Sequence, residues 1–88
     1  MDEKMKVIEL TPRQAQVLIC LAEDMSSKQI FRQFNISTRT VMAHTLAIKA
    51  AFNVYTRTGA LAAAVKCGTL RWDDEHEQWI CAQRQGKA

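Results

Sequence analysis

The stretch that determines the fold runs from Ser26 to Phe52 and reads SSKQIFRQFNISTRTVMAHTLAIKAAF. Ser26 and Gln29 have the spacing of a capping box, in which two side chains pair with the backbone N–H groups at a helix start. Asn35 tolerates left-handed backbone angles and Ser37 is a favourable N-cap residue, so the chain between them predicts a tight turn. We therefore predict a short helix after Ser26, a turn, and a longer helix ending at Phe52, which together form a helix-turn-helix motif.

A further helix is predicted before this motif. Thr11 is a favourable N-cap, Pro12 fits the first helical position, and Gln14 completes another capping box. Apolar residues then recur at helical spacing as far as about Asp24, which predicts one buried face.

A fourth helix is predicted after the motif, because Asn53 ends the third helix and Thr56 caps a new one. It covers residues 57–67, is rich in Ala, and is closed by Gly68. The predicted fold class is thus mainly all-α, with four helices and a short C-terminal extension.

The extension has two possible structures. Leu70, Trp72, Trp79 and Cys81 alternate on either side of the charged run at 73–77, which favours a hairpin. The alternative is a helix capped by Asp73, with acidic residues in its first turn and basic residues near its end. We favour the hairpin and expect both tryptophans to cover the core, with an anchor for a partner as the alternative role.

Composition limits the class of protein. With 88 residues, 48% hydrophobic and 24% charged, the chain is expected to form one helical domain. It has no apolar run of roughly 18 residues and no signal-peptide pattern at its start, so we expect a cytoplasmic protein without membrane contact. Its three cysteines lack a C-x-x-C pair, so we expect buried thiols, no disulfide and no metal site. We find no catalytic set or phosphate-binding loop, and expect neither enzyme activity nor a cofactor.

Charge is distributed unevenly along the chain. We divide the chain into an N-terminal arm (1–9), a helix-turn-helix domain (10–70) and a C-terminal extension (71–88). The middle part has seven basic and two acidic residues, whereas each end has a net charge of −1. A basic domain with mildly acidic ends suits a polyanionic partner, although basic surfaces are also common in other proteins.

The chain resembles the LuxR/GerE helix-turn-helix family. The resemblance covers residues 10–70 and includes polar positions that define turns and caps. Its matching positions are Leu10 to Arg13, Val17-Leu18, Leu21-Ala22, Ser26 to Ile30, Ile36-Ser37, Thr40-Val41, His44, Ile48, Val54, Arg57-Thr58 and Gly68. The resemblance implies a four-helix domain whose third helix enters the major groove of DNA and whose fourth helix often forms a dimer.

Helical periodicity divides the third helix into two faces. Val41, His44, Ile48 and Phe52 form one apolar stripe and are expected in the core. We expect His44, which the family pattern matches, to be a packed and hydrogen-bonded core residue and not a catalytic or metal-binding one. The opposite face would meet DNA.

Lysines are missing from that opposite face. The resembled family usually has lysines just after the Thr-Val pair and near the end of this helix, where the present chain has Met42 and Ala51. Because Lys and Arg supply most phosphate contacts, tight and specific binding by a monomer is not expected.

Two sets of candidate site residues follow. The first would bind DNA through the starts of the second and third helices and the exposed face of the third; its members are Ser27, Lys28, Ser37, Thr38, Arg39, Thr40, Met42, Ala43, Leu46 and Lys49. The second would form a homodimer interface of small residues on the fourth helix; its members are Ala60, Ala63, Ala64 and Cys67.

Two functions remain open at this point. The first is a DNA-binding transcriptional regulator acting on double-stranded DNA as a homodimer. The alternative is a protein-binding modulator that keeps the fold, has weak or no DNA binding, and binds a larger transcriptional regulator through its apolar third helix.

Overall fold

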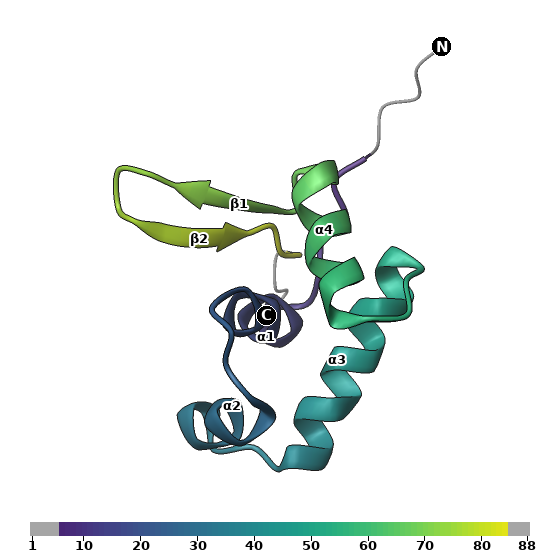
Figure 1. Cartoon of the computed structure of the whole chain (residues 1–88), viewed down its shortest axis with the longest axis vertical. Helices are drawn as coiled ribbons and strands as arrows, with labels where there is room; N and C mark the ends of the chain where they lie inside the picture. Colours follow the sequence, from purple (N-terminus) through teal and green to yellow (C-terminus); the bar gives the residue numbers. More distant parts are fainter. Residues whose placement is uncertain (1–5, 85–88) are drawn as a thin grey trace.

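The computed structural model describes residues 6–84 and contains four helices followed by a two-stranded antiparallel sheet (Figure 1). The elements are α1 (Pro12–Ala22), α2 (Ser27–Phe34), α3 (Thr38–Phe52), α4 (Arg57–Cys67), β1 (Leu70–Asp73) and β2 (Gln78–Cys81). The four helices and their order agree with the prediction, and the hairpin is confirmed over the alternative helix.

Each helix starts at a hydroxyl side chain. The oxygens of Thr11, Ser26, Ser37 and Thr56 accept hydrogen bonds from the backbone N–H three residues later. At Thr11 and Ser26 the predicted capping boxes are complete, because the glutamine at the third helical position accepts from the cap residue's own N–H. These bonds satisfy backbone donors that a helix cannot pair internally, so they fix where each helix begins.

Three helices end at a residue in the left-handed region. Asn35 has φ 55°, Asn53 has φ 57° and Gly68 has φ 87°. Side chains with a Cβ pay a steric cost there, which Asn and Gly bear most easily. The tight turn predicted at Asn35 is therefore confirmed.

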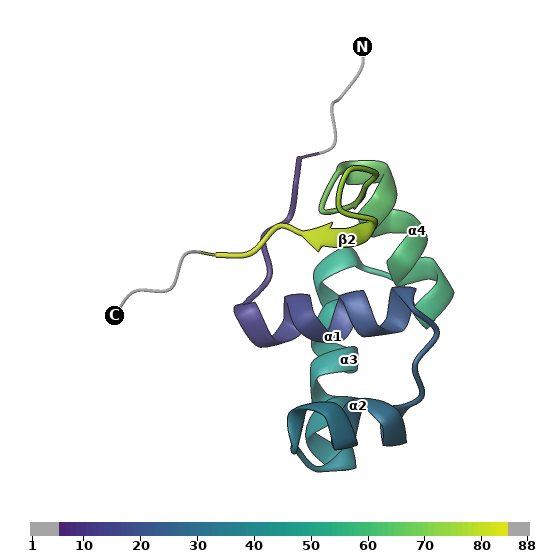
Figure 2. The same cartoon turned by 90° about the vertical axis from the view of Figure 1, so that its left-hand side faces the viewer.

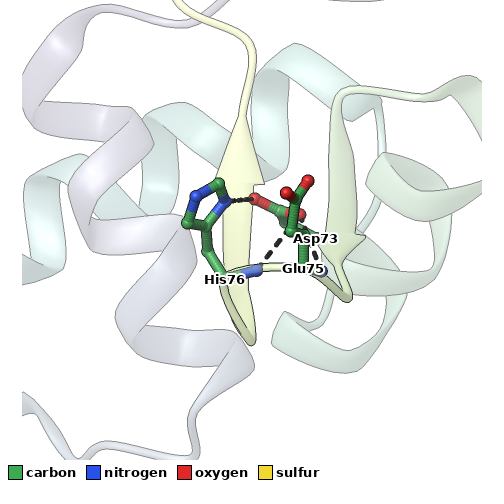
Figure 3. Close-up of side chains that lie close together, drawn as sticks. All are labelled: Asp73, Glu75 and His76. Atoms are coloured by element: carbon green, nitrogen blue, oxygen red, sulfur yellow. Dashed lines mark hydrogen bonds and ion pairs between the residues drawn. The ribbon is translucent and has the colours of Figure 1, made fainter.

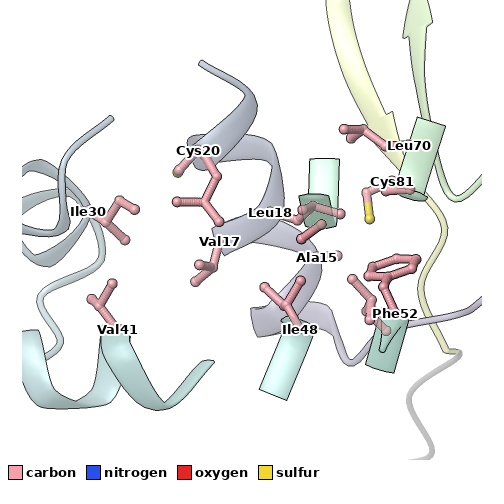
Figure 4. Packing of buried hydrophobic residues seen from close by; sticks show 14 of the residues in the cluster. Ala15, Val17, Leu18, Cys20, Ile30, Val41, Ile48, Phe52, Leu70 and Cys81 are labelled. Carbon is pink, nitrogen blue, oxygen red and sulfur yellow. The ribbon is translucent and has the colours of Figure 1, made fainter. Parts of the chain in front are cut away.

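The core is built around α1, which packs against α3, α4 and β2. Figure 4 shows its side chains meeting those of the other elements. Ala15, Val17 and Leu18 are fully buried at its centre. The remaining buried apolar residues are Leu10, Cys20, Leu21, Ile30, Val41, Ile48, Phe52, Ala60, Ala64, Cys67, Leu70 and Cys81.

Two expectations about buried residues need correction. His44 is only half-buried, at the edge of the stripe formed by Val41, Ile48 and Phe52, and so is not a core residue. On α4, Ala60 and Ala64 have no exposed surface and Cys67 is 7% exposed, all within this chain's own core. A second copy cannot contact residues that are already covered, so the predicted dimer set was wrong for these three.

The hairpin covers one side of the core. Leu70 pairs with Cys81 and Trp72 with Trp79, and the two indole rings meet edge to face at 5.2 Å. Trp79 packs against the core as expected, whereas Trp72 is 47% exposed and lies outside it. The strands begin at residue 70, so the hairpin crosses the predicted limit between domain and extension.

The segment before α1 is bonded to residues on either side of the hairpin: Thr69 before β1, and Gln83 and Arg84 after β2. Leu10 makes an isolated parallel bridge with Gln83, and its carbonyl accepts a 2.8 Å bond from the Arg84 N–H. The buried Thr69 hydroxyl accepts from the Ile8 N–H at 2.9 Å and donates to the Ile8 carbonyl at 2.8 Å. The two ends of the described chain are thus joined.

The helix-turn-helix lies at one end of the molecule. Figures 1 and 2 show α2 and the start of α3 on the side of α1 away from the hairpin. Within residues 6–84, none of the helices is both long and apolar enough to cross a membrane.

Candidate nucleic-acid interface

The solvent side of α3 presents a mostly apolar surface. At 100° per residue, Arg39, Met42, Ala43, Leu46 and Ala50 fall within one arc of about 100°, opposite the core stripe. All five are exposed, and Met42 and Leu46 have exposed fractions of 56% and 62%. We call these five residues the α3 face.

One edge of the α3 face slopes into an open groove between three helices. The groove is lined by Ser27 of α2, by Met42, Thr45, Leu46 and Lys49 of α3, and by Arg57 of α4. Its lining includes two large apolar side chains, Met42 and Leu46, and two cations, Lys49 and Arg57. The groove therefore combines apolar surface with positive charge on one side of α3.

The start of α2 lies against the start of α4 at this groove. The Arg57 guanidinium donates to the Met25 carbonyl at 3.3 Å, which links the residue before the α2 cap to the first turn of α4. The first residues of both helices, Ser27 and Arg57, line the groove, so the positive ends of both helix dipoles lie near it. Positive helix ends are suited to phosphate oxygens.

The start of α3 is arranged differently. The Ser37 hydroxyl is 2.9 Å from that of Thr40 and also accepts from the Thr40 N–H at 3.0 Å. Ser37, Thr38 and Arg39 are exposed, while Thr40 is half-buried. Thr40 therefore has less freedom than its neighbours to contact a ligand.

Acidic residues are unevenly distributed along the chain. The chain has no acidic residue from Met25 to Trp72, a stretch that includes α2, α3 and α4. Four of the acids, Asp73, Asp74, Glu75 and Glu77, follow in the hairpin on the other side of α1 (Figure 1). The α2–α3 end therefore favours an anionic partner.

In a comparison with protein families, residues 9–64 of the chain match the family model described as bacterial regulatory proteins, luxR family. The chain belongs to this family. Comparison with curated proteins gave no match. Membership confirms the resemblance and supports a DNA-binding regulator of transcription, a class defined by binding and not by catalysis.

The structure brings together only part of the predicted DNA-binding set. Ser27, Met42, Leu46 and Lys49 line the groove. The others are spread over the adjoining surface of α2 and α3: Lys28, Ser37, Thr38, Arg39, Thr40 and Ala43. Arg57 also lines the groove but was not among the predicted DNA-binding residues. Two features of the sequence could have indicated it: it matches the family pattern, and it lies in the acid-free stretch.

A cluster of polar side chains lies at the hairpin turn, far along the chain from α3. Ligand atoms of Asp73, Glu75 and His76 lie within 4.8 Å of one another (Figure 3). The Asp73 carboxylate accepts from the Glu75 and His76 N–H groups and lies 2.7 Å from His76 Nδ1. The carboxylate is therefore occupied in shaping the turn.

The three cysteines are buried and unpaired, as predicted. Burial raises the pKa of the Cys81 thiol to about 11. Burial, with a smaller contribution from the Glu23 carboxylate, also raises the pKa of Cys20. Both thiols are thus protonated and poorly reactive at neutral pH.

Proposed function

We propose that the protein regulates transcription by binding double-stranded DNA. The α3 face would lie in the major groove of the DNA, and Lys49 and Arg57, which line the protein's own groove, would contact the phosphate backbone. The observation that carries this proposal is the position of Lys49, Arg57 and two helix N-termini beside the exposed face of α3. The acid-free stretch from Met25 to Trp72 and the family membership support it.

Phosphate contacts and base contacts would have different roles. Lys28 and the first turn of α2 would bind a phosphate on one side of the DNA major groove, with Lys49 and Arg57 beside them. These contacts supply affinity and orientation without selecting a sequence. The α3 face would then be fixed against base edges, where Arg39 can donate two hydrogen bonds to guanine.

Salt dependence tests this assignment. Each phosphate contact makes the slope of log K against log salt steeper by about 0.9, so Lys49→Gln and Arg57→Gln should each flatten the slope by about that amount for every bound subunit. At about 0.1 M salt the corresponding loss is roughly eightfold in affinity. The measurement is fluorescence anisotropy with a random-sequence duplex at several salt concentrations.

Arg71→Gln provides the matched control, because Arg71 is an exposed cation on β1 of the hairpin. It should leave the slope unchanged. If Arg71→Gln flattens the slope as much as Lys49→Gln and Arg57→Gln do, the groove is not the DNA-binding surface.

We also propose that the protein binds DNA as a homodimer, since one subunit offers few cations. The side of α4 that faces solvent includes Ala62 and Val65, and Val65 is 52% exposed. This side replaces the buried alanines as the interface. Val65→Glu should convert the dimer to a folded monomer in sedimentation, and a dimer that persists would exclude this surface.

A second candidate function is a protein-binding modulator that acts on a larger transcriptional regulator. The exposure of Met42 and Leu46 favours it, because large apolar side chains at the centre of a surface suit protein contacts. The same anisotropy assay separates the two functions. Absence of binding to any duplex at low salt would favour the modulator.

A further inference from the structure

The α3 face has an unusual chemistry for a surface that meets base pairs. Of its five residues, only Arg39 carries hydrogen-bond donors, and it lies in the first turn of the helix. Met42, Ala43, Leu46 and Ala50 are all apolar and exposed. From the second turn onwards, this face offers base edges only aliphatic groups and the thioether of Met42, none of which donates a hydrogen bond.

Base pairs differ in what they present to such a surface. In the major groove both kinds of base pair present hydrogen-bonding groups, such as the O6 and N7 acceptors of guanine and the amino group of cytosine in a G·C pair, but only an A·T pair adds an apolar group, the C5-methyl of thymine. An apolar side chain pressed against G·C would remove water from those groups without replacing its hydrogen bonds, which is costly. Against thymine, the same side chain buries a methyl group, which is favourable.

We infer that Met42, Ala43 and Leu46 select DNA by contact with thymine methyl groups, so that the base pairs under the middle of α3 are A·T pairs. The inference rests on the proposed function, because it requires α3 to enter the major groove. It adds the means of selection: apolar contact in place of hydrogen bonding, with Lys49 and Arg57 of the protein's groove holding the backbone.

The test compares thymine with uracil, which lacks only the C5-methyl group. Two alternating A·T duplexes of about 24 base pairs, one made with thymine and one with uracil, are long enough for two half-sites. Burying one methyl group corresponds to about a fourfold change in Kd. The preference for the thymine duplex should therefore be between about fourfold and sixtyfold per subunit, for one to three methyl contacts in each subunit.

A double variant shows whether the stated residues cause the preference. Met42→Ala with Leu46→Ala shortens two exposed side chains and keeps good helix formers, so the fold should persist in circular dichroism. The variant should lose most of the preference for thymine, so that the ratio of its Kd values for the uracil and thymine duplexes falls towards one. If the variant keeps the full preference, Met42 and Leu46 do not select thymine and the inference is wrong.

The remaining outcomes separate this inference from the proposed function. Equal binding of the thymine and uracil duplexes by the wild type would overturn the inference and leave DNA binding intact. Failure to bind either duplex, and also a random-sequence duplex at low salt, would overturn both and place a protein partner on the α3 face.

Discussion

Placing lysines at the two α3 positions where the family pattern has them is the most informative perturbation. Met42 and Ala51 are both exposed, so each new ammonium group can stay in water. They lie nine residues apart, about 13 Å along the helix axis; Met42 is at one edge of the α3 face and Ala51 lies beyond the other edge. The double variant Met42→Lys, Ala51→Lys can therefore reach a phosphate on each flank of the major groove.

The size of the gain follows from counterion release. At about 0.1 M salt each added phosphate contact increases affinity roughly eightfold, so two contacts give roughly sixtyfold per subunit. The slope of log K against log salt should become steeper by about 1.8 per subunit, which is about 3.6 for a homodimer. Anisotropy titrations of a random-sequence duplex at several salt concentrations measure both quantities.

A charge-matched control separates position from net charge. Gln78→Lys with Gln83→Lys adds the same two charges to exposed residues of β2 and the segment that follows it. This control should leave the slope nearly unchanged. If both double variants gain the same DNA affinity, added charge increases binding wherever it is placed. The proposal that the α3 face enters the major groove would then be refuted.

Three further predictions concern stability and are measured by urea unfolding. Ala64→Glu should lower the free energy of unfolding by about 3–5 kcal/mol, because it buries a charge in the core. Ala62→Glu, on the exposed side of α4, should lower it by less than about 0.5 kcal/mol. Similar losses for the two variants would place Ala64 outside the core. Thr69→Val should cost about 1–3 kcal/mol by leaving both backbone groups of Ile8 unpaired, and a neutral result would exclude those two bonds. Burial raises the pKa of Cys81 from 9.0 to about 11 in the folded protein, so as the pH rises the thiol ionises in the unfolded chain before it ionises in the folded one. This contribution to the free energy of unfolding should be fully present below pH 9 and be lost as the pH rises towards 11. Cys81→Ala should lessen that loss, and an unchanged pH profile would contradict the shift.

Helix limits could be predicted because the signals that set them are local. Each N-cap oxygen bonds to a backbone N–H only three residues away, as at Ser26 and Ser37. The left-handed ends at Asn35 and Asn53 likewise depend on the residue itself. Such short-range interactions can be inferred from neighbouring residues in one sequence.

The orientation of α4 could not be predicted in the same way. Residues 60–65 are all apolar, so periodicity does not show which side of this helix is buried. The buried side is decided by contacts with α1, α3 and β1, which are distant in sequence. The groove was missed for a similar reason, since Ser27, Lys49 and Arg57 come from three separate helices.

The bonds that join Ile8 to Thr69 and Leu10 to Arg84 also affect the order in which the protein assembles during synthesis. Ile8 and Thr69 are 61 positions apart, and Leu10 lies at the start of the first helix made. Until β2 leaves the ribosome, the part of the α1 surface that β2 buries stays open, although α1 itself can already form and pack against α3 and α4. The helix-turn-helix is therefore translated in full before the core can close, and the last described residues complete it.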